Sequence, residues 1–386
     1  MPLRSHAPSR PDASADIAVV GVSARSLAAA ARRAGLRPLV LDLFADEDTR
    51  ALAATTVILQ RGEGFSLDPK DLMAQLERHV GPDLPLVLGT GFEAMPERVE
   101  AIANRFRLMG SGRRTLTWLK QPAAFAQLLA DLSIPHPLLF AESAPNGVAA
   151  LEKQAGAAGG GHVRPARRAR GAGWYLQEFV PGRSVSALFL GNGRSARLLG
   201  FSEQWCAPTE DAPFRYGGAA GPIRLAPDLE AEIEAALTAL TDATGLLGLA
   251  STDLVIGETG WWLIEVNPRP GASLDVFDRP PLAPLLRLHL DACEGRLPEL
   301  KPCNLDIGAT VQAAAIFYAP RPVEIGSDLP VWVADRPAPG SLIDQDEPIC
   351  TVFASGHDLT EARAQLAGRI DHLWHGLNAA SRQAAE

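Results

Sequence analysis

Short apolar runs alternate with amphipathic stretches at the start of the chain, a pattern typical of parallel α/β structure. Ile17–Val20 predicts a strand, and the Ala-rich segment after it predicts a helix. A second strand is predicted at Pro38–Leu43, and a third lies within residues 84–92, before the helical segment MPERVEAIANRF. Parallel strands need a crossover helix between them, so this order predicts a β-α-β beginning.

The turn after the first strand, GVSARS, has a single glycine and lacks the G-x-G-x-x-G pattern of dinucleotide-binding loops. We therefore expect a Rossmann-like domain that is structural and binds no nucleotide of its own. The missing glycines also argue against a nicotinamide-dependent oxidoreductase built on this domain.

The segment TLTWLKQPAAFAQLLADLSIPHPLLF, beginning at Thr115, predicts one helix followed by an extended exit imposed by prolines. One face of this helix carries four apolar residues, Phe125, Leu128, Leu129 and Leu132. A glycine-rich loop at residues 156–161 is the next distinctive feature. Strands at Trp174–Val180 and Ser184–Leu190 follow it, joined by the turn PGR.

An acidic amphipathic segment, APDLEAEIEAALTALTDATG, predicts a helix capped by Gly245. The next segment, LLGLASTDLVIGETGWWLIEVNP, alternates as a β-hairpin with GETG as its turn. From about Leu300 the chain has strand-like pieces and ends in a helix predicted over residues 358–377.

Composition narrows the class of protein. A chain of 386 residues suits two or three domains, and 47% hydrophobic with 21% charged residues is ordinary for a globular protein. A net charge of −9 argues against a nucleic-acid binder, and no apolar run approaches the roughly 20 residues that span a bilayer. Four scattered cysteines (Cys206, Cys293, Cys303 and Cys350) without CxxC spacing favour reduced thiols in the cytoplasm.

The hairpin carries the strongest chemical signal. Glu265, Asn267 and Arg269 alternate at the end of its second strand, so we expect them on one face, with Asp253 on the partner strand. Carboxylate and amide oxygens suit Mg²⁺, and a guanidinium suits a phosphate or carboxylate. The alternative is an exposed strand face with a surface ion pair, which is disfavoured because polar groups beside apolar positions need partners.

Two weaker signals precede the hairpin. KQAGAAGGGHV places Lys153 ahead of a loop whose backbone N–H groups can wrap anionic oxygens, although no GK[ST] follows as in a Walker loop. YLQEFV offers main-chain groups to a purine edge. Taken alone, the first segment favours a disordered surface loop over a phosphate-binding loop, and the second favours a plain edge strand.

Together, and in this order, these pieces resemble the ATP-grasp superfamily of carboxylate–amine ligases and biotin-dependent carboxylases. The matching segments are LKQPAAFAQLLADLSIPHP, LEKQAGAAGGGHV, YLQEFVPGRSVSALFL and STDLVIGETGWWLIEVNPRPGAS. The resemblance implies an α/β fold: a Rossmann-like N-terminal domain, an ATP-grasp α+β fold and a small C-terminal subdomain. We expect the boundaries at 1–15 for a disordered tail, 16–114, 115–300 and 301–386.

The resemblance also implies roles for individual residues, with ATP and Mg²⁺ (or Mn²⁺) as cofactors. The ATP phosphates would be bound by Lys120, opening the helix, and by Lys153, ending the strand before the loop. The flap would be Gly159, Gly160 and Gly161; the adenine hinge Gln177, Glu178, Phe179 and Val180; the metal ligands Asp253, Glu265 and Asn267. Arg269 would stabilise the acyl phosphate or the transferred phosphoryl group. Where family members often place an acidic residue on the ribose, this chain has Ser184 and Ser186, and Lys153 is followed by Gln154 instead of proline.

The implied reaction forms an amide from a small-molecule carboxylate and an amine through an acyl phosphate. The segments PGRSVSALFLGNG, FSEQWC and FRYGGAAGPI are closest to amino-acid ligases such as the glutamate ligases of methanofuran and methanopterin biosynthesis in one-carbon metabolism. Arg215, Arg224 and Ser273 are candidates for a substrate carboxylate or for plain surface positions. The histidines, among them His136, His162 and His289, are interpreted as structural or solvated.

Two alternatives remain at this point. One is a biotin-carboxylase-like enzyme that activates bicarbonate, for which the chain is short and lacks a biotinyl-lysine segment. The other is a non-catalytic ATP-binding regulator on the same fold, which has no need of an intact metal and phosphate set. Homodimers are common among such enzymes, and neither a nucleic acid nor a membrane is expected as a partner.

Overall fold

The computed structural model describes residues 15–299, 310–326 and 329–383, so residues 1–14 of the predicted tail and Cys303 lie outside the described residues. A four-stranded parallel sheet forms the first layer, with strand order β3-β2-β1-β4. Its strands are β1 (Ile17–Val20), β2 (Pro38–Asp42), β3 (Thr55–Ile58) and β4 (Leu86–Leu88). The connecting helices are α1 (Arg25–Arg33), α2 (Glu47–Leu52), α3 (Pro69–His79) and α4 (Pro96–Ala103).

The two central strands of this sheet are fully buried, as expected of parallel strands covered on both faces. The chain order places β1 between β2 and β4, so the crossover direction reverses beside β1. The carboxyl ends of the four strands therefore meet around a topological switch point, where open α/β sheets bind ligands.

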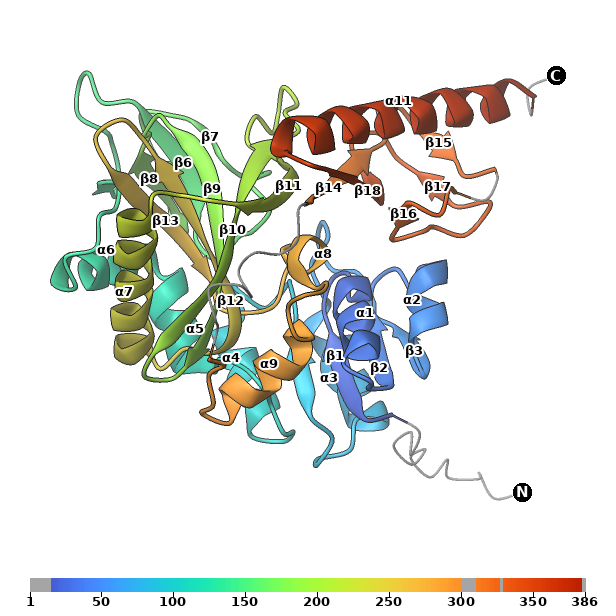
Figure 1. The fold of residues 1–386 in the computed structure, drawn as a ribbon, viewed down its shortest axis with the longest axis horizontal. Helices are drawn as coiled ribbons and strands as arrows, with labels where there is room; N and C mark the ends of the chain where they lie inside the picture. The colour runs from blue at the N-terminus through green and yellow to red at the C-terminus, as the bar shows by residue number, and fades with distance from the viewer. Residues whose placement is uncertain (1–14, 300–309, 327–328, 384–386) are drawn as a thin grey trace.

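An eight-stranded antiparallel sheet is the second and largest layer, in the order β13-β12-β9-β10-β11-β14-β18-β16 (Figure 1). Its strands are β9 (Arg183–Asn192), β10 (Ala196–Cys206), β11 (Tyr216–Ile223), β12 (Leu247–Ile256), β13 (Trp261–Asn267), β14 (Val311–Tyr318), β16 (Val333–Ala334) and β18 (Pro348–Gly356). The helices beside it are α7 (Pro227–Thr244), α8 (Leu274–Phe277) and α9 (Leu285–Cys293). The predicted helix cap is present, because Gly245 is left-handed with φ 68° at the end of α7.

Strand β9 shows how this sheet is buried on both faces. Val185 and Phe189 pack in the core that contains α7, whereas Leu188 and Leu190 pack in the core that contains α1 and α9. Successive side chains of a strand point to opposite faces, so the face that carries Ser186 is directed toward the N-terminal sheet.

A small four-stranded sheet, ordered β5-β8-β6-β7, forms a separate layer. Its strands are β5 (Leu139–Phe140), β6 (Ala150–Gln154), β7 (Arg164–Pro165) and β8 (Trp174–Glu178). The two strands predicted on either side of the turn PGR lie in different sheets, since β8 pairs with β5 and β6, whereas β9 pairs with β10 and β12. The turn therefore connects two layers.

The single helix predicted from Thr115 is wrong in detail, because the structure has two. These are α5 (Arg113–Lys120) and α6 (Pro122–Asp131), and Gln121 between them is extended, with φ −94° and ψ 110°. Pro122 disfavours helical geometry at the residue before it. Lys120 thus ends a helix instead of opening one, and its side chain is buried against the large sheet.

The C-terminal segment extends the large sheet instead of forming an independent one. β14 pairs with β11 and β18, and α11 (Leu359–Gln383), a few residues longer than predicted, packs on β14 and β18. A two-stranded ribbon of β15 (Val323–Glu324) and β17 (Leu342–Ile343) lies beside it. In Figure 1 this segment lies over the N-terminal helices α1 and α2.

Candidate active site

The hairpin β12–β13 places its polar residues on one face, as the alternation predicts. Asp253 pairs directly with Glu265, and Ser251 pairs with Asn267. Opposed residues of an antiparallel ladder project to the same side. Because Ser186 of β9 lies opposite Asp253, this is the face of the large sheet that is directed toward the N-terminal sheet.

Lys120 reaches this face from the end of α5. Its ammonium donates one hydrogen bond to Glu265 Oε1 and another, of 2.9 Å, to Asn267 Oδ1. The lysine is buried, so its charge is compensated by these oxygens instead of by water. A cation therefore already lies between two of the three predicted metal ligands.

The two carboxylates have opposite electrostatic environments. Burial alone would raise the pKa of Glu265, but the charge and hydrogen bond of Lys120 outweigh it and hold that pKa below its ordinary value. Burial raises the pKa of Asp253 to about 6, and the charge of Glu265 adds to the shift. Asp253 accepts a 3.2 Å hydrogen bond from the Gln204 side chain. The ionised carboxylate of Glu265 thus lies beside the more weakly acidic carboxyl group of Asp253. A further cation near them would favour the ionised form of both groups.

Lys153, near the end of β6, approaches the same cluster from the small sheet. Its ammonium is buried and donates a 2.6 Å hydrogen bond to Gln177 Oε1 on β8. Burial lowers the pKa of Lys153, while the nearby charges of Glu265 and Asp253 oppose the shift. The structure therefore brings both predicted phosphate-binding lysines to the carboxylate pair.

Arg269 lies beyond the end of β13 and not on the strand itself. Its Nε donates a 2.7 Å hydrogen bond to Oε1 of Glu93, which is only 3% exposed and follows β4 of the N-terminal sheet. Although burial would raise the pKa of Glu93, Arg269 and Lys120 lower it to about 2. This ion pair fixes the end of the hairpin to the N-terminal layer, a contact that the sequence does not reveal.

The glycine-rich loop between β6 and β7 lies against two other segments. The carbonyl of Gly159 accepts a 2.9 Å hydrogen bond from the N–H of Tyr216, and a Cβ on Gly160 would lie 2.1 Å from the carbonyl oxygen of Phe214. Gly159 and Gly160 both have positive φ, 77° and 72°. Gly156 packs on Ala94, the neighbour of Glu93. At Gly160 a side chain would clash with the Phe214 carbonyl, so only glycine fits at that position.

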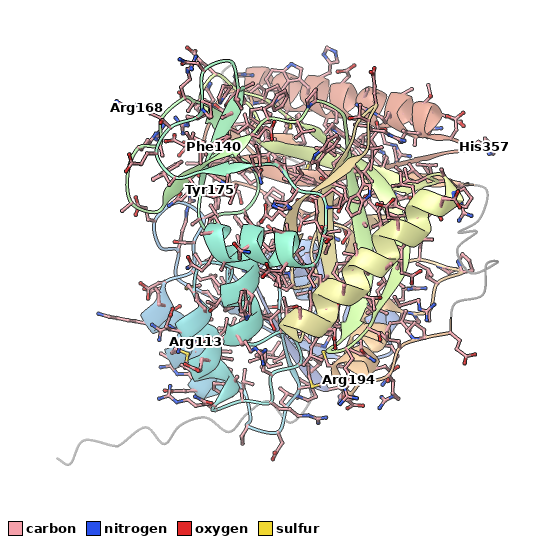
Figure 2. All side chains as sticks on the ribbon, turned by 90° about the vertical axis from the view of Figure 1, so that its left-hand side faces the viewer. Arg113, Phe140, Arg168, Tyr175, Arg194 and His357 are labelled. Carbon is pink, nitrogen blue, oxygen red and sulfur yellow. The ribbon has the colours of Figure 1, made fainter. Side chains whose placement is uncertain are left out.

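The predicted hinge, residues 177–180, ends β8 and enters the connection to β9. The N–H of Glu178 donates to Leu138 and that of Phe179 to Ala149, so neither is free for a ligand. In the described part of the chain the N–H of Val180 donates to no backbone carbonyl. Figure 2 shows Phe140 and Tyr175 on the small sheet that carries this segment, above Arg113 at the start of α5.

The two serines proposed for the ribose differ in burial. Ser186 is 3% exposed and lies opposite Asp253, whereas Ser184, two residues earlier on the same face, is exposed. Ser184 is therefore the serine nearer the hinge and accessible to a ligand.

Sequence reasoning missed several polar residues of the cluster. His162 was interpreted as structural or solvated, yet its pKa is lowered by burial and responds to the charges of Glu265, Lys153 and Lys120. Burial, followed by the charge of Glu265, raises the pKa of Tyr175, the cross-strand partner of Lys153. Glu93, His162, Tyr175 and Gln204 come from four separate segments, so no spacing in the sequence could have grouped them.

Other sequence candidates have structural partners. The Arg215 guanidinium stacks on Tyr318 with 3.7 Å to the ring centroid and donates hydrogen bonds to the carbonyls of Ala207 and Asp346, so it is engaged by protein groups. Arg224 is exposed. His289 bonds Leu249 N–H and the Met109 carbonyl, and burial lowers its pKa to about 4, as a structural histidine requires.

A divalent metal fits the donor set. No group of three or more His, Cys, Asp or Glu side chains shaped for a metal occurs among residues 15–299, 310–326 and 329–383. Two carboxylates and an amide oxygen instead match Mg²⁺, which typically takes one or two carboxylates and completes its shell with phosphate and water. The ammonium held by Glu265 and Asn267 shows that these oxygens already accept a cation.

Comparison with known proteins identifies the architecture. Residues 123–273 match the family model described as ATP-grasp domain, and no curated protein matches the chain by sequence. No helix among the described residues is long and apolar enough to cross a membrane.

Three solved structures illustrate the likeness in fold. A biotin carboxylase complex from Campylobacter jejuni superposes with a TM-score of 0.67 at 12% identity, covering 90% of this chain and 89% of that one. An L-amino acid ligase from Bacillus licheniformis gives 0.66 at 15% identity, covering 92% and 96%. An N5-carboxyaminoimidazole ribonucleotide synthetase from Thermotoga maritima gives 0.63 at 13% identity, covering 92% and 98%. The predicted α/β fold, with an N-terminal parallel sheet followed by ATP-grasp antiparallel sheets, is thereby confirmed.

Proposed function

We propose that the protein is an ATP-dependent ligase that joins a carboxylate to an amine through an acyl phosphate. The observation that carries this proposal is the buried Lys120 ammonium held by Glu265 and Asn267 on the sheet face that Lys153 and Arg269 also approach. Such a set of oxygen ligands and cations suits the charge that spreads over phosphoryl oxygens during transfer.

The position of each residue supports a proposed role. Asp253, Glu265 and Asn267 would hold Mg²⁺, which when bound neutralises the negative charge of the phosphates. Lys120 and Lys153 would bind phosphate oxygens, Lys120 exchanging its carboxylate partner for ATP. Arg269, oriented by Glu93, would hold the acyl phosphate.

The glycine loop and the hinge account for the remaining contacts. Gly159, Gly160 and Gly161 would cover the phosphates and exclude water from the acyl phosphate. The carbonyl of Glu178 and the N–H of Val180 would contact the adenine edge, with Gln177 and Phe179 flanking them. Ser184 would contact the ribose. No covalent enzyme nucleophile is needed.

The finer identity of the substrates rests on the sequence resemblance. That resemblance makes an amino acid such as glutamate a first amine to test, in a route to a one-carbon cofactor.

The test is trapping of the acyl phosphate. The protein is incubated with Mg-ATP and pools of carboxylates, with hydroxylamine as the amine, and hydroxamate and ADP are measured together. Glu265→Gln removes a proposed metal ligand, and Glu258→Gln is its matched control, since Glu258 lies exposed in the turn of the same hairpin.

Carboxylate-dependent hydroxamate formation that is lost in Glu265→Gln and kept in Glu258→Gln would support the ligase. ADP release with bicarbonate alone would favour a biotin-carboxylase-like enzyme. Tight Mg-ATP binding without turnover on any pool would favour a regulator, and absence of nucleotide binding would refute the proposal.

A further inference from the structure

A cavity with a volume of about 670 Å³ lies between the N-terminal sheet and the C-terminal segment. This volume lies within the roughly 300–1,000 Å³ range typical of small-molecule sites. The walls come from the loops after β1, β2, β3 and β4, from the segment 270–275 after β13, and from the large sheet and its C-terminal extension. The last part comprises Tyr216 of β11, the segment 335–338 after β16, and residues of β14, β17 and β18. None of the residues proposed above to bind ATP or Mg²⁺ lines it.

The cavity adjoins the candidate reaction centre at two points. Gly271 lines it, and a Cβ on Gly271 would lie 2.2 Å from Nη1 of Arg269, so the guanidinium rests directly on this wall. Tyr216 also lines it, and besides burial the charges of both Asp275 and Asp253 raise the pKa of its hydroxyl. Gly271 is therefore a wall that the cavity shares with the group proposed to hold the acyl phosphate.

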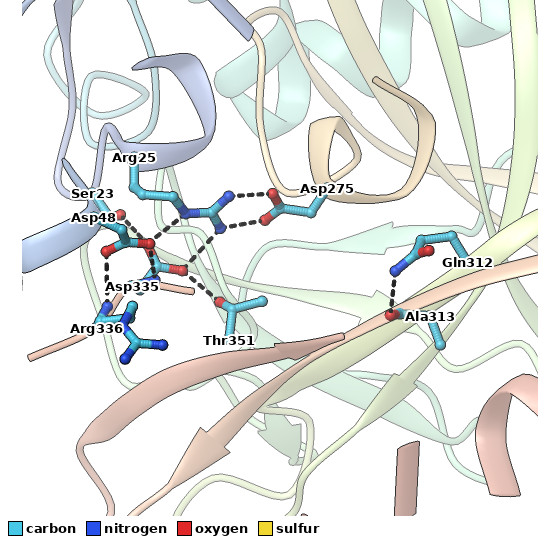
Figure 3. Close-up of polar contacts among 9 residues, drawn as sticks. All are labelled: Ser23, Arg25, Asp48, Asp275, Gln312, Ala313, Asp335, Arg336 and Thr351. Atoms are coloured by element: carbon cyan, nitrogen blue, oxygen red, sulfur yellow. Dashed lines mark hydrogen bonds and ion pairs between the residues drawn. The ribbon is translucent and has the colours of Figure 1, made fainter. Parts of the chain in front are cut away.

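Most charged groups around the cavity already have partners. Arg25 is bonded to Asp275 at 2.5 and 2.7 Å and to Asp335 at 2.9 and 3.2 Å (Figure 3). Arg61 forms an ion pair with Glu347 at 3.0 Å. Arg25 and Arg61 are therefore paired with carboxylates of the protein itself. Arg50 also lines the cavity, but it is exposed and its Nε donates a 2.6 Å hydrogen bond to the Ala45 carbonyl.

Asp46 is the exception among the lining carboxylates. It begins α2, yet its side chain caps no backbone N–H, and no hydrogen bond or ion pair joins it to another side chain among the described residues. Burial raises its pKa to about 8, with Asp335, Asp42 and Asp48 adding to the shift. The ionised form of such a carboxylate is favoured when a cation lies against it.

The rest of the lining is largely apolar. Phe44 and Phe65 contact each other with ring centroids 5.9 Å apart, and aliphatic side chains face the space from the C-terminal strands. These aliphatic residues are Ile316, Leu342, Ile343 and Ile349. Such a surface stabilises a hydrophobic body by removing it from water.

We propose that this cavity is the site of the amine substrate, an amine with an apolar or aromatic body whose ammonium group binds Asp46. The inference rests on the proposed ligase function and specifies its acceptor. This substrate differs from glutamate. A carboxylate on the amine would lie among Asp46, Asp275, Asp335 and Glu347, and the cation of the lining that forms no ion pair among the described residues, Arg50, is exposed to solvent.

The reaction balances with this substrate. The amine nitrogen forms a bond to the acyl carbon while the bond from that carbon to the phosphate oxygen breaks. Of the three protons on the ammonium, one stays in the amide, one leaves with the released hydrogen phosphate and one goes to solvent.

Binding can be tested without turnover, by titration calorimetry on the full-length protein saturated with a non-hydrolysable ATP analogue and Mg²⁺. The probes are 2-phenylethylamine, its matched acid 3-phenylpropionate, and glutamate. Asp46→Asn keeps the shape and a good helix-capping residue. Glu47→Gln is the matched control, because Glu47 is the exposed neighbour on the same helix and does not line the cavity.

We expect 2-phenylethylamine to bind more tightly than either acid. Asp46→Asn should weaken it roughly ten- to a hundredfold, the worth of a hydrogen bond to a charged group, while Glu47→Gln leaves it unchanged. Equal amine affinity in Asp46→Asn and wild type, tighter binding of either acid, or no saturable amine binding would each overturn the inference. If the nucleotide analogue itself fails to bind, the proposed function fails first, so the two failures are distinguishable.

Discussion

Replacement of Arg25 by methionine is expected to destabilise the folded protein by about 3–5 kcal/mol, the cost of breaking a buried ion pair from one side. Arg25 is 5% exposed and makes four hydrogen bonds to two carboxylates from different parts of the chain, Asp275 and Asp335. Asp335 is tied further to Ser23 and Thr351 (Figure 3). Methionine fills a similar volume, so the loss is mainly electrostatic.

The expected shift in melting temperature follows from the size of the protein. An unfolding entropy of about 2.1 cal/mol/K per residue gives roughly 0.8 kcal/mol/K for 386 residues, so the midpoint should fall by about 4–6 °C. Scanning calorimetry measures it. Arg296→Met is the control, because Arg296 pairs with Asp291 and Glu294 at the surface, with its side chain 59% exposed. Exposed pairs contribute little to stability.

The pH dependence provides a second check. Arg25 outweighs burial and keeps the pKa of Asp335 below its ordinary value, so this contribution is present at neutral pH and is lost as the pH falls through that lowered pKa. Burial already raises the pKa of Asp275 despite the opposing charge of Arg25. Without Arg25, the pKa values of both Asp275 and Asp335 should rise, because burial is then no longer opposed by that charge. The penalty of the substitution should therefore shrink as the pH is lowered from 8 to 5. A fall in melting temperature equal to that of Arg296→Met, or a loss of stability in Arg25→Met that grows as the pH is lowered, would refute the reasoning.

Three further substitutions test the site. Gly160→Ala should weaken Mg-ATP binding at least tenfold, because its Cβ would meet the Phe214 carbonyl at 2.1 Å with φ at +72°. The control is Gly368→Ala in α11, where a Cβ meets no atom within 4 Å, and it should bind Mg-ATP normally in the same calorimetric titration. Glu93→Gln should lower the free energy of unfolding by about 3 kcal/mol and reduce hydroxamate formation, because the substitution leaves Arg269 without its buried ionised partner. Urea unfolding measures the stability, and a free energy equal to that of the wild type would contradict this prediction. Lys153→Met should raise the Kd for ATP more than tenfold, because Lys153 is proposed to bind phosphate, and should change the unfolding midpoint little. An unchanged ATP affinity in the calorimetric titration would exclude that role.

Local patterns in the sequence were sufficient where the relevant contacts are close along the chain. The alternation in β12 and β13 predicted the hairpin, its turn and the shared face of Asp253, Glu265 and Asn267, because a two-residue period decides which side chains share a face. Gly245 marked the end of α7 for an equally local reason, a left-handed backbone. Pro122 is also a local signal for a helix boundary, but the apolar pattern continues across it, so the sequence pattern predicted one helix where the chain is extended at Gln121.

Only the tertiary structure could decide which distant groups meet. Glu93 binds Arg269 across 176 positions of the chain, Lys120 reaches Glu265 across 145, and Arg25 joins Asp335 across 310. The cavity has the same origin, since its walls come from the carboxyl ends of the parallel strands and from C-terminal strands that extend the large sheet. By itself the sequence determined the periodic elements and the chemical identity of the polar groups on the hairpin. The partners of those groups, their pKa values and the space beside them depend on packing between layers, which no local pattern encodes.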